Sequence, residues 1–104
     1  MPNISQIDIH QVNEYLAEKS ANIVDIRDPA SFSMGHIPGA ILLNEQNMEE
    51  VIGQLDKEKT LVVCCYHGNS SQGAAGYLME KGFKDVHSMI GGHEAWSHTY
   101  PSER

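Results

Sequence analysis

Apolar residues along this chain gather in short strand-like runs that alternate with segments of helical spacing. A continuous apolar run at residues 60–64 suits a central parallel strand. Further strands are predicted at residues 22–26, 40–43 and 86–88. Helices are predicted at about residues 9–19, 29–34, 47–55 and 71–80, and again after Gly91-Gly92. This alternation predicts an α/β domain built on a mainly parallel sheet.

Polar caps and glycines set the expected ends of the helices. Asp8 is the expected N-cap of the first helix. Asp28 followed by Pro29 is the favoured start of a short helix, which should end at Gly35. Gly82 is the expected stop of the helix that begins near residue 71.

The strongest strand is followed at once by a candidate nucleophile, Cys65. A polar loop at residues 66–70 then leads into a helix. In open α/β sheets, ligands bind outside the carboxyl ends of the strands, where Cys65 is expected to lie. The turn and the helix start would point N–H groups at its sulfur, and such surroundings lower a thiol pKa from its usual value of about 8.5.

Neighbouring residues of the loop fit this interpretation. Ser70 and Ser71 offer hydroxyl donors, and Gly68 allows the backbone to turn inward. The alternative is that Cys65 is a small buried apolar residue, a common role for free cysteine. Cys64 lies one residue earlier on the strand, so it should face the opposite side and be structural.

Composition and charge limit the classes of function. The chain has 104 residues, which fits one domain spanning residues 1–104. Its net charge of −7 argues against a nucleic-acid partner, and no apolar run is long enough for a membrane span. Residues 1–6 do not have the pattern of a secretory signal peptide. The two adjacent cysteines close no useful loop, so we expect reduced thiols and a cytoplasmic protein.

Three motifs, in order, resemble those of the rhodanese family. The first is Val-Asp-Ile-Arg-Asp-Pro at residues 24–29, with Phe32 and then Gly-His-Ile-Pro-Gly-Ala at residues 35–40. The last is Gly-Gly-His-Glu-Ala-Trp at residues 91–96. Between them, Cys-Tyr-His-Gly-Asn-Ser-Ser at residues 65–71 resembles the active loop of the single-domain thiosulfate sulfurtransferases of the GlpE type.

This resemblance implies both a fold and a reaction. The implied fold is one rhodanese-like domain, with a sheet of about five short strands and helices on both faces. The implied reaction moves sulfane sulfur from thiosulfate to cyanide or a thiol, through a persulfide on Cys65. The residues implied in the site are the catalytic Cys65 and the substrate-binding residues Tyr66, His67, Gly68, Asn69, Ser70 and Ser71.

The loop departs from much of the family because residues 65–71 include no Arg or Lys. We therefore expect weak binding of thiosulfate, a dianion. Arg27 and His36 are expected to be structural, through ion pairing and packing, and Trp96 to be a core residue. For Tyr66 and His67, two interpretations stay open: a side chain that forms or tunes the pocket, or a solvent-facing side chain whose N–H alone lines it.

Other functions of a nucleophilic cysteine compete with sulfur transfer. A cysteine phosphatase of this fold needs Arg six residues after the nucleophile to clamp phosphate, and Ser71 stands there. The alternative that stays open is a persulfide relay or sulfur-carrier module serving a protein partner; an inert scaffold is disfavoured by the presence of Cys65.

His93 and His98 lack metal-ligand spacing, so no metal and no cofactor are expected. The chain is expected to be a monomer or a homodimer.

Overall fold

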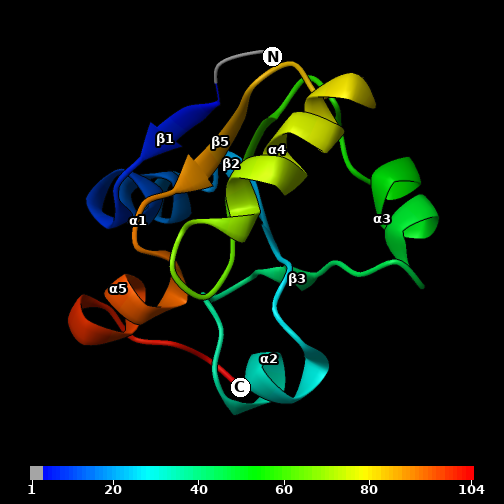
Figure 1. The fold of residues 1–104 in the computed structure, drawn as a ribbon. Coiled ribbons are helices and arrows are strands. Elements are labelled where there is room, and N and C mark those ends of the chain that lie inside the picture. Colours follow the sequence, from blue (N-terminus) through cyan, green and yellow to red (C-terminus); the bar gives the residue numbers. More distant parts are fainter. Residues whose placement is uncertain (1–3) are drawn as a thin grey trace.

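Five parallel strands form one central sheet in this computed structural model, which describes residues 4–104 (Figure 1). The strand order is β1-β5-β4-β2-β3, and every neighbouring pair runs parallel. The strands are β1 (Ser5–Ile7), β2 (Ala21–Asp25), β3 (Ile41–Leu42), β4 (Thr60–Cys64) and β5 (Val86–Met89). The predicted fold, a mainly parallel sheet of about five short strands, is confirmed.

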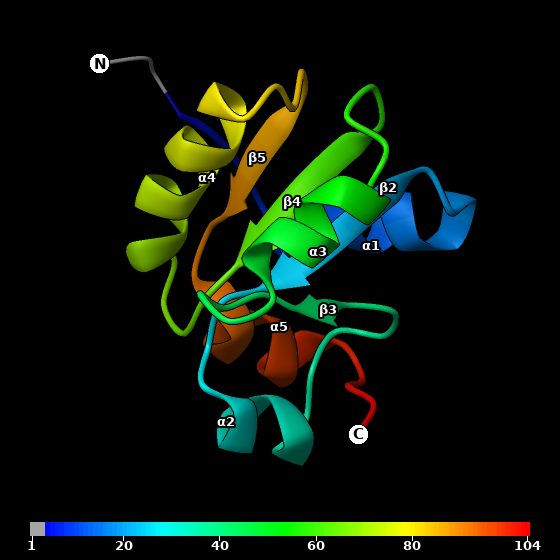
Figure 2. The ribbon, with the colours of Figure 1, turned by 90° about the vertical axis from the view of Figure 1, so that its right-hand side faces the viewer.

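Helices cover both faces of this sheet, as predicted (Figure 2). One face packs against α3 (Met48–Gln54) and α4 (Ser70–Glu80), which contribute Val51 and Leu78 to a first core cluster. The other packs against α1 (Ile9–Glu18) and α5 (Gly92–Thr99), which contribute Val12 and Trp96 to a second. A short helix, α2 (Pro29–Met34), follows β2. Within residues 4–104, no helix has the length and apolar character of a membrane span.

Local sequence signals explain most of the element boundaries. The Asp8 carboxylate accepts a hydrogen bond from the Gln11 N–H at 2.9 Å, so the predicted N-cap of α1 is confirmed. Asp28 caps α2 in the same way, with Pro29 at the first helical position. The central place of β4 is also confirmed, because four of its five residues are buried and β5 and β2 flank it.

The edge strand β1 was not among the segments that the apolar pattern predicted. It has only three residues, two of them exposed, so it carries almost no alternation. Its hydrogen bonds to β5 are what make it a strand, with Ser5 opposite His87. Pairing of this kind depends on the neighbouring strand and leaves little trace in local sequence.

The first motif is structural, as expected. The Arg27 guanidinium donates to both oxygens of the buried Asp25 carboxylate at 2.8–3.0 Å and to the Gly35 carbonyl at 2.7 Å. The His36 ring stacks on Phe32 with centroids 3.9 Å apart, and its Nε2 lies 3.3 Å from a Glu103 carboxylate oxygen. These contacts tie β2, α2 and the chain end together beneath the carboxyl edge of the sheet. Trp96 is buried, as predicted.

Candidate active site

The candidate nucleophile, Cys65, directly follows the last residue of β4. The loop that starts there leads into α4, which begins at Ser70, one residue earlier than predicted. In Figures 1 and 2 this loop lies at the carboxyl end of the sheet, close to α5. Cys65 is only 2% exposed, so its sulfur is at the bottom of the loop.

Three protein groups surround the Cys65 sulfur. The Gly68 N–H donates to Sγ at 3.1 Å, and the Ser71 N–H donates to it at 3.2 Å. Ser71 Oγ also lies 3.2 Å from Sγ. Because Ser71 is in the first turn of α4, its N–H belongs to the positive end of the helix dipole. The arrangement is a small nest of donors suited to an anionic sulfur.

These donors outweigh the effect of burial on the thiol. Burial alone raises the pKa of Cys65, because a thiolate loses hydration there. The Ser71 hydroxyl and the N–H groups of Ser71, Gly68 and His67 act in the opposite direction, and the net result is a Cys65 pKa below its ordinary value. The geometry therefore favours a thiolate, the form of cysteine that acts as a nucleophile.

The shape of the loop depends on glycines and on α5, which packs directly against it. The His93 N–H donates to the Cys65 carbonyl at 2.8 Å, and the Glu94 N–H donates to the Tyr66 carbonyl at 3.1 Å. Gly68 has a φ of +91°, and a Cβ there would lie 2.8 Å from the Gly91 nitrogen. The last sequence motif, residues 91–96, therefore fixes the backbone of the nucleophile loop through these hydrogen bonds.

The remaining loop side chains do not bond to the sulfur. Tyr66 is 44% exposed, and its hydroxyl lies 3.2 Å from Ser31 Oγ. The His67 ring points away, with Nδ1 2.5 Å from a Glu94 carboxylate oxygen and its side chain 65% exposed. Asn69 and Ser70 are also exposed. Of the predicted loop residues, the fold thus brings Gly68 and Ser71 onto Sγ, with His67 adding its N–H alone.

Comparisons with known proteins identify the family of this chain. The sequence pattern of the Rhodanese-like domain matches residues 8–99, most of the chain. The chain belongs to the rhodanese family. The resemblance drawn from the three motifs is therefore confirmed.

Curated relatives are similar to this rhodanese over nearly its whole length. The thiosulfate sulfurtransferase GlpE of Shewanella oneidensis is 50% identical over 96 residues, which cover 92% of this chain and 95% of that protein. The protein of the same name from Ectopseudomonas mendocina is 46% identical over 103 residues, which cover 99% of this chain and 94% of that one. Both relatives are named for sulfur transfer.

Solved structures support the fold independently. A rhodanese-related protein from Thermoplasma volcanium has a TM-score of 0.81 at 26% identity, covering 95% of this chain and 97% of that one. A thiosulfate sulfurtransferase from Pseudomonas aeruginosa has a TM-score of 0.88 at 23% identity. That match covers 98% of this chain but 20% of the other, and it shows the rhodanese fold alone.

One residue of the rhodanese site was missed by sequence reasoning. Ser88 Oγ lies 2.7 Å from Ser71 Oγ, and both residues are fully buried. The sequence does indicate that Ser88 faces the core, because it lies two residues after Val86 and strand alternation turns both side chains toward the same face. A serine at a buried strand position needs a hydrogen-bond partner, but only the packing of α4 against β5 identifies that partner as Ser71.

Cys64 occupies the opposite side of β4, as predicted. It is fully buried in the second core cluster, the group that includes Val62, Met89 and Trp96. Burial, helped by the Asp25 carboxylate, raises the pKa of the Cys64 thiol well above its usual range. Cys64 is thus held as a neutral thiol, and both cysteines are free.

Replacing Cys64 by Ala is therefore expected to leave sulfur transfer largely intact. The change removes one buried sulfur atom and should cost about 1 kcal/mol of stability. Thiocyanate formation from thiosulfate and cyanide measures the first effect, and urea unfolding measures the second. Loss of turnover in a folded Cys64→Ala protein would mean that the wrong sulfur has been assigned.

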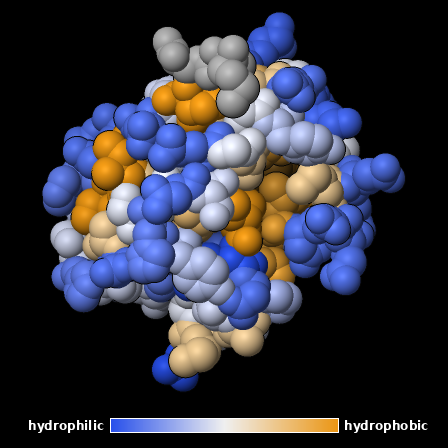
Figure 3. All heavy atoms as spheres, in the orientation of Figure 1, coloured by the Kyte–Doolittle hydropathy of each residue, from blue (hydrophilic) through white to orange (hydrophobic). Residues whose placement is uncertain are grey.

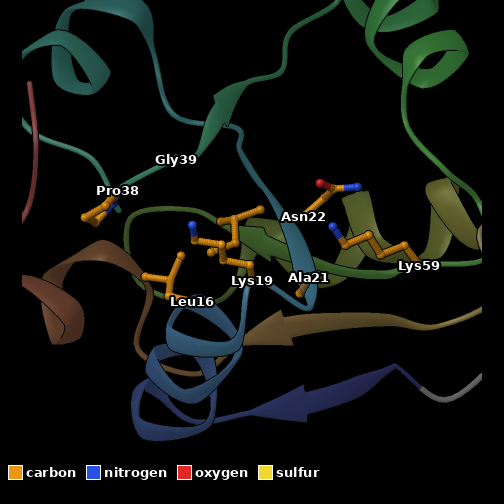
Figure 4. Close-up of a pocket in the computed structure, with 8 residues that line it drawn as sticks. Leu16, Lys19, Ala21, Asn22, Pro38, Gly39 and Lys59 are labelled. Atoms are coloured by element: carbon orange, nitrogen blue, oxygen red, sulfur yellow. The ribbon is translucent and has the colours of Figure 1, made fainter.

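Two further hollows lie away from the nucleophile. Figure 3 shows apolar surface between α3 and α4, where a pocket of about 310 Å³ is lined by Met48 and Ala74. The pocket in Figure 4, of about 380 Å³, lies near the amino ends of β2 and β4, flanked by Lys19 and Lys59. Neither includes a residue of the active loop. Within residues 4–104, no three His, Cys, Asp or Glu side chains cluster as a metal-ligand set.

Proposed function

We propose that this rhodanese is a thiosulfate sulfurtransferase that carries sulfane sulfur on Cys65. The observation that carries the proposal is the set of contacts on Cys65 Sγ: the N–H groups of Gly68 and Ser71 donate to it, and the Ser71 hydroxyl lies 3.2 Å away. The names of relatives about 50% identical over most of the chain support the same reaction. The proposed unit is a single rhodanese domain, residues 1–104.

The first step would load the enzyme. The Cys65 thiolate attacks the outer sulfur of thiosulfate, and a new S–S bond forms. The bond between the two thiosulfate sulfurs breaks, and its electron pair leaves with sulfite. The Cys65 persulfide that results keeps one negative charge, which the N–H groups around the sulfur can stabilise without any proton transfer.

The second step would return the enzyme to its starting state. The carbon of cyanide attacks the outer persulfide sulfur, the S–S bond breaks, and its electron pair returns to Cys65 as thiolate while thiocyanate leaves. A thiol acceptor would react in the same way and become a persulfide. Since thiolate and sulfite are both good leaving groups, neither step needs a general base.

The rest of the loop is proposed to bind the small anionic donor. The proposed binding residues are Tyr66, His67, Gly68, Asn69 and Ser70, together with Ser71, whose N–H donates to the sulfur. The loop holds no cationic side chain, and the nearby Arg27 already donates to Asp25 and Gly35. Thiosulfate would therefore be held by N–H groups and uncharged side chains, which predicts weak binding and a high KM.

A persulfide relay to a protein thiol is the second candidate. The supporting observation is exposed apolar surface beside the loop: Tyr66 is 44% exposed and Ile90 is 50% exposed. Ile90 stands between Met89 and Gly91, the two residues that a Cβ on Gly68 would meet. Both candidates need a reduced Cys65, so we propose a cytoplasmic location, with no nucleic-acid or membrane partner and a monomeric or homodimeric state.

The pH dependence of turnover tests the proposed thiolate. Reactive thiolate increases as pH rises through the pKa of Cys65, and that pKa lies below the ordinary cysteine value. Under saturating cyanide, the rise of kcat/KM for thiosulfate with pH should therefore have its midpoint below about pH 8.5, the midpoint of a free cysteine. A midpoint at or above that pH, in folded protein, would contradict a stabilised thiolate.

A further inference from the structure

Ser88 does not contact the Cys65 sulfur directly, but it contacts Ser71, which does. The register of β5 against β4 places Ser88 beside Val63, two residues before Cys65. Ser88 Oγ lies 2.7 Å from Ser71 Oγ, which in turn lies 3.2 Å from Cys65 Sγ. Ser71 and Ser88 are both 0% exposed. The two hydroxyls and the sulfur thus form a buried chain that runs from β5 through α4 to the nucleophile.

The direction of the protons along this chain differs between thiolate and thiol. Each serine hydroxyl has one proton to donate. With a Cys65 thiolate, Ser88 donates to Ser71, Ser71 donates to Sγ, and both protons have an acceptor. If a Cys65 thiol donates to Ser71 Oγ, Ser71 must turn toward Ser88. The Ser88 proton then has no acceptor among residues 4–104, and an unsatisfied buried donor is unfavourable.

We propose that Ser88 is a positioning residue for sulfur transfer, whose hydroxyl donates to Ser71 Oγ and so directs the Ser71 proton at Cys65 Sγ. The inference rests on the proposed function only in taking Cys65 as the nucleophile. Ser88 supplies no atom to the reaction. It selects the orientation of the one side-chain donor on the sulfur.

Charged and titratable groups near the site are not part of this chain. The Asp25–Arg27 pair belongs to β2 and its continuation, and Cys64 faces the second core cluster. His67 pairs with Glu94 at the exposed side of the loop. Since substitution of Ser88 alters none of these, a change in Cys65 ionisation would report on the hydroxyl chain.

The test is the pH dependence of Cys65 alkylation by iodoacetamide, followed by peptide mass. Ser88→Ala should raise the midpoint by about half to one pH unit, which lowers the thiolate fraction about three- to tenfold below that midpoint. Ser71→Ala should raise it at least as much. Because Ser88 acts through Ser71, the Ser71→Ala/Ser88→Ala double variant should match Ser71→Ala alone.

An isosteric pair separates the hydroxyl from packing. Ser88→Thr and Ser88→Val place nearly the same shape in the core, but Thr alone keeps the hydroxyl. The Thr variant should have a midpoint close to wild type, and the Val variant should match Ser88→Ala. Equal midpoints in the Thr and Val variants, or shifts that simply add in the double variant, would overturn the proposal.

Persulfide loading of the wild-type protein by thiosulfate, measured in parallel, keeps the two hypotheses apart. Normal loading with an unchanged midpoint in Ser88→Ala would reject the positioning role alone. A shifted midpoint in a protein that thiosulfate does not load would support the positioning role and reject the proposed function.

Discussion

Replacing Cys65 by Ser is expected to reduce sulfur transfer from thiosulfate to cyanide by about a thousandfold or more. A serine hydroxyl stays protonated at neutral pH and cannot hold a sulfane sulfur, so the covalent intermediate is lost. The fold should remain, because Ser is close to Cys in size and the donors on Sγ can also bond to a hydroxyl oxygen. Thiocyanate formation measures the loss, and urea unfolding checks the fold.

The matched control for this variant is one residue away. Cys64→Ala removes the other thiol from the same strand end while leaving the nest of donors untouched. We therefore expect the two cysteine variants to differ by orders of magnitude in turnover. Substantial residual turnover in Cys65→Ser would refute the assignment of the nucleophile.

Replacing Gly92 by Ala is expected to damage both the loop and the fold. Gly92 has a φ of +60°, and a Cβ there would lie 2.5 Å from the Cys65 and Tyr66 carbonyl oxygens. All the atoms it would meet are backbone, so α5 or the nucleophile loop must move. We expect a loss of about 2–4 kcal/mol in stability from the strained backbone and the overlap together, and loss of most turnover. Urea unfolding and thiocyanate formation measure the two effects.

Gly73→Ala is the control for this substitution. Gly73 lies within α4, close to the loop in sequence, and a Cβ there would meet nothing within 4 Å. The change should stabilise the protein by about 0.5–1 kcal/mol, because Ala loses less conformational entropy than Gly in a helix. If both alanine variants behaved alike, the close contact between α5 and the loop would not be what constrains the site.

Strong local patterns made most of this fold predictable from the sequence. The continuous apolar run of β4 and the Asp28-Pro29 start of α2 each have one physical interpretation. β1 could not be found in this way, because it is an edge strand of three residues with two of them exposed. Its existence depends on hydrogen bonds to β5, which no local pattern encodes.

The site was predictable in part, for the same reason. Cys65 could be predicted as the nucleophile because it lies between the end of a strand and the start of a helix. Gly68 and Ser71 could be predicted as its neighbours because they follow it closely in the sequence. Ser88 lies 17 residues beyond Ser71 and reaches the site only because α4 packs against β5. Likewise, the N–H groups of α5 reach the loop carbonyls through tertiary packing.

The central claim, a persulfide on Cys65, is tested most directly by intact mass spectrometry. The protein is incubated briefly with thiosulfate, measured, treated with cyanide and measured again, with Cys65→Ser protein beside it. The account predicts a gain of one sulfur atom that maps to Cys65, disappears with cyanide and is absent from the variant. No gain in wild-type protein whose Cys65 titrates as a free thiol would contradict transfer from thiosulfate and would favour a relay supplied by a protein donor.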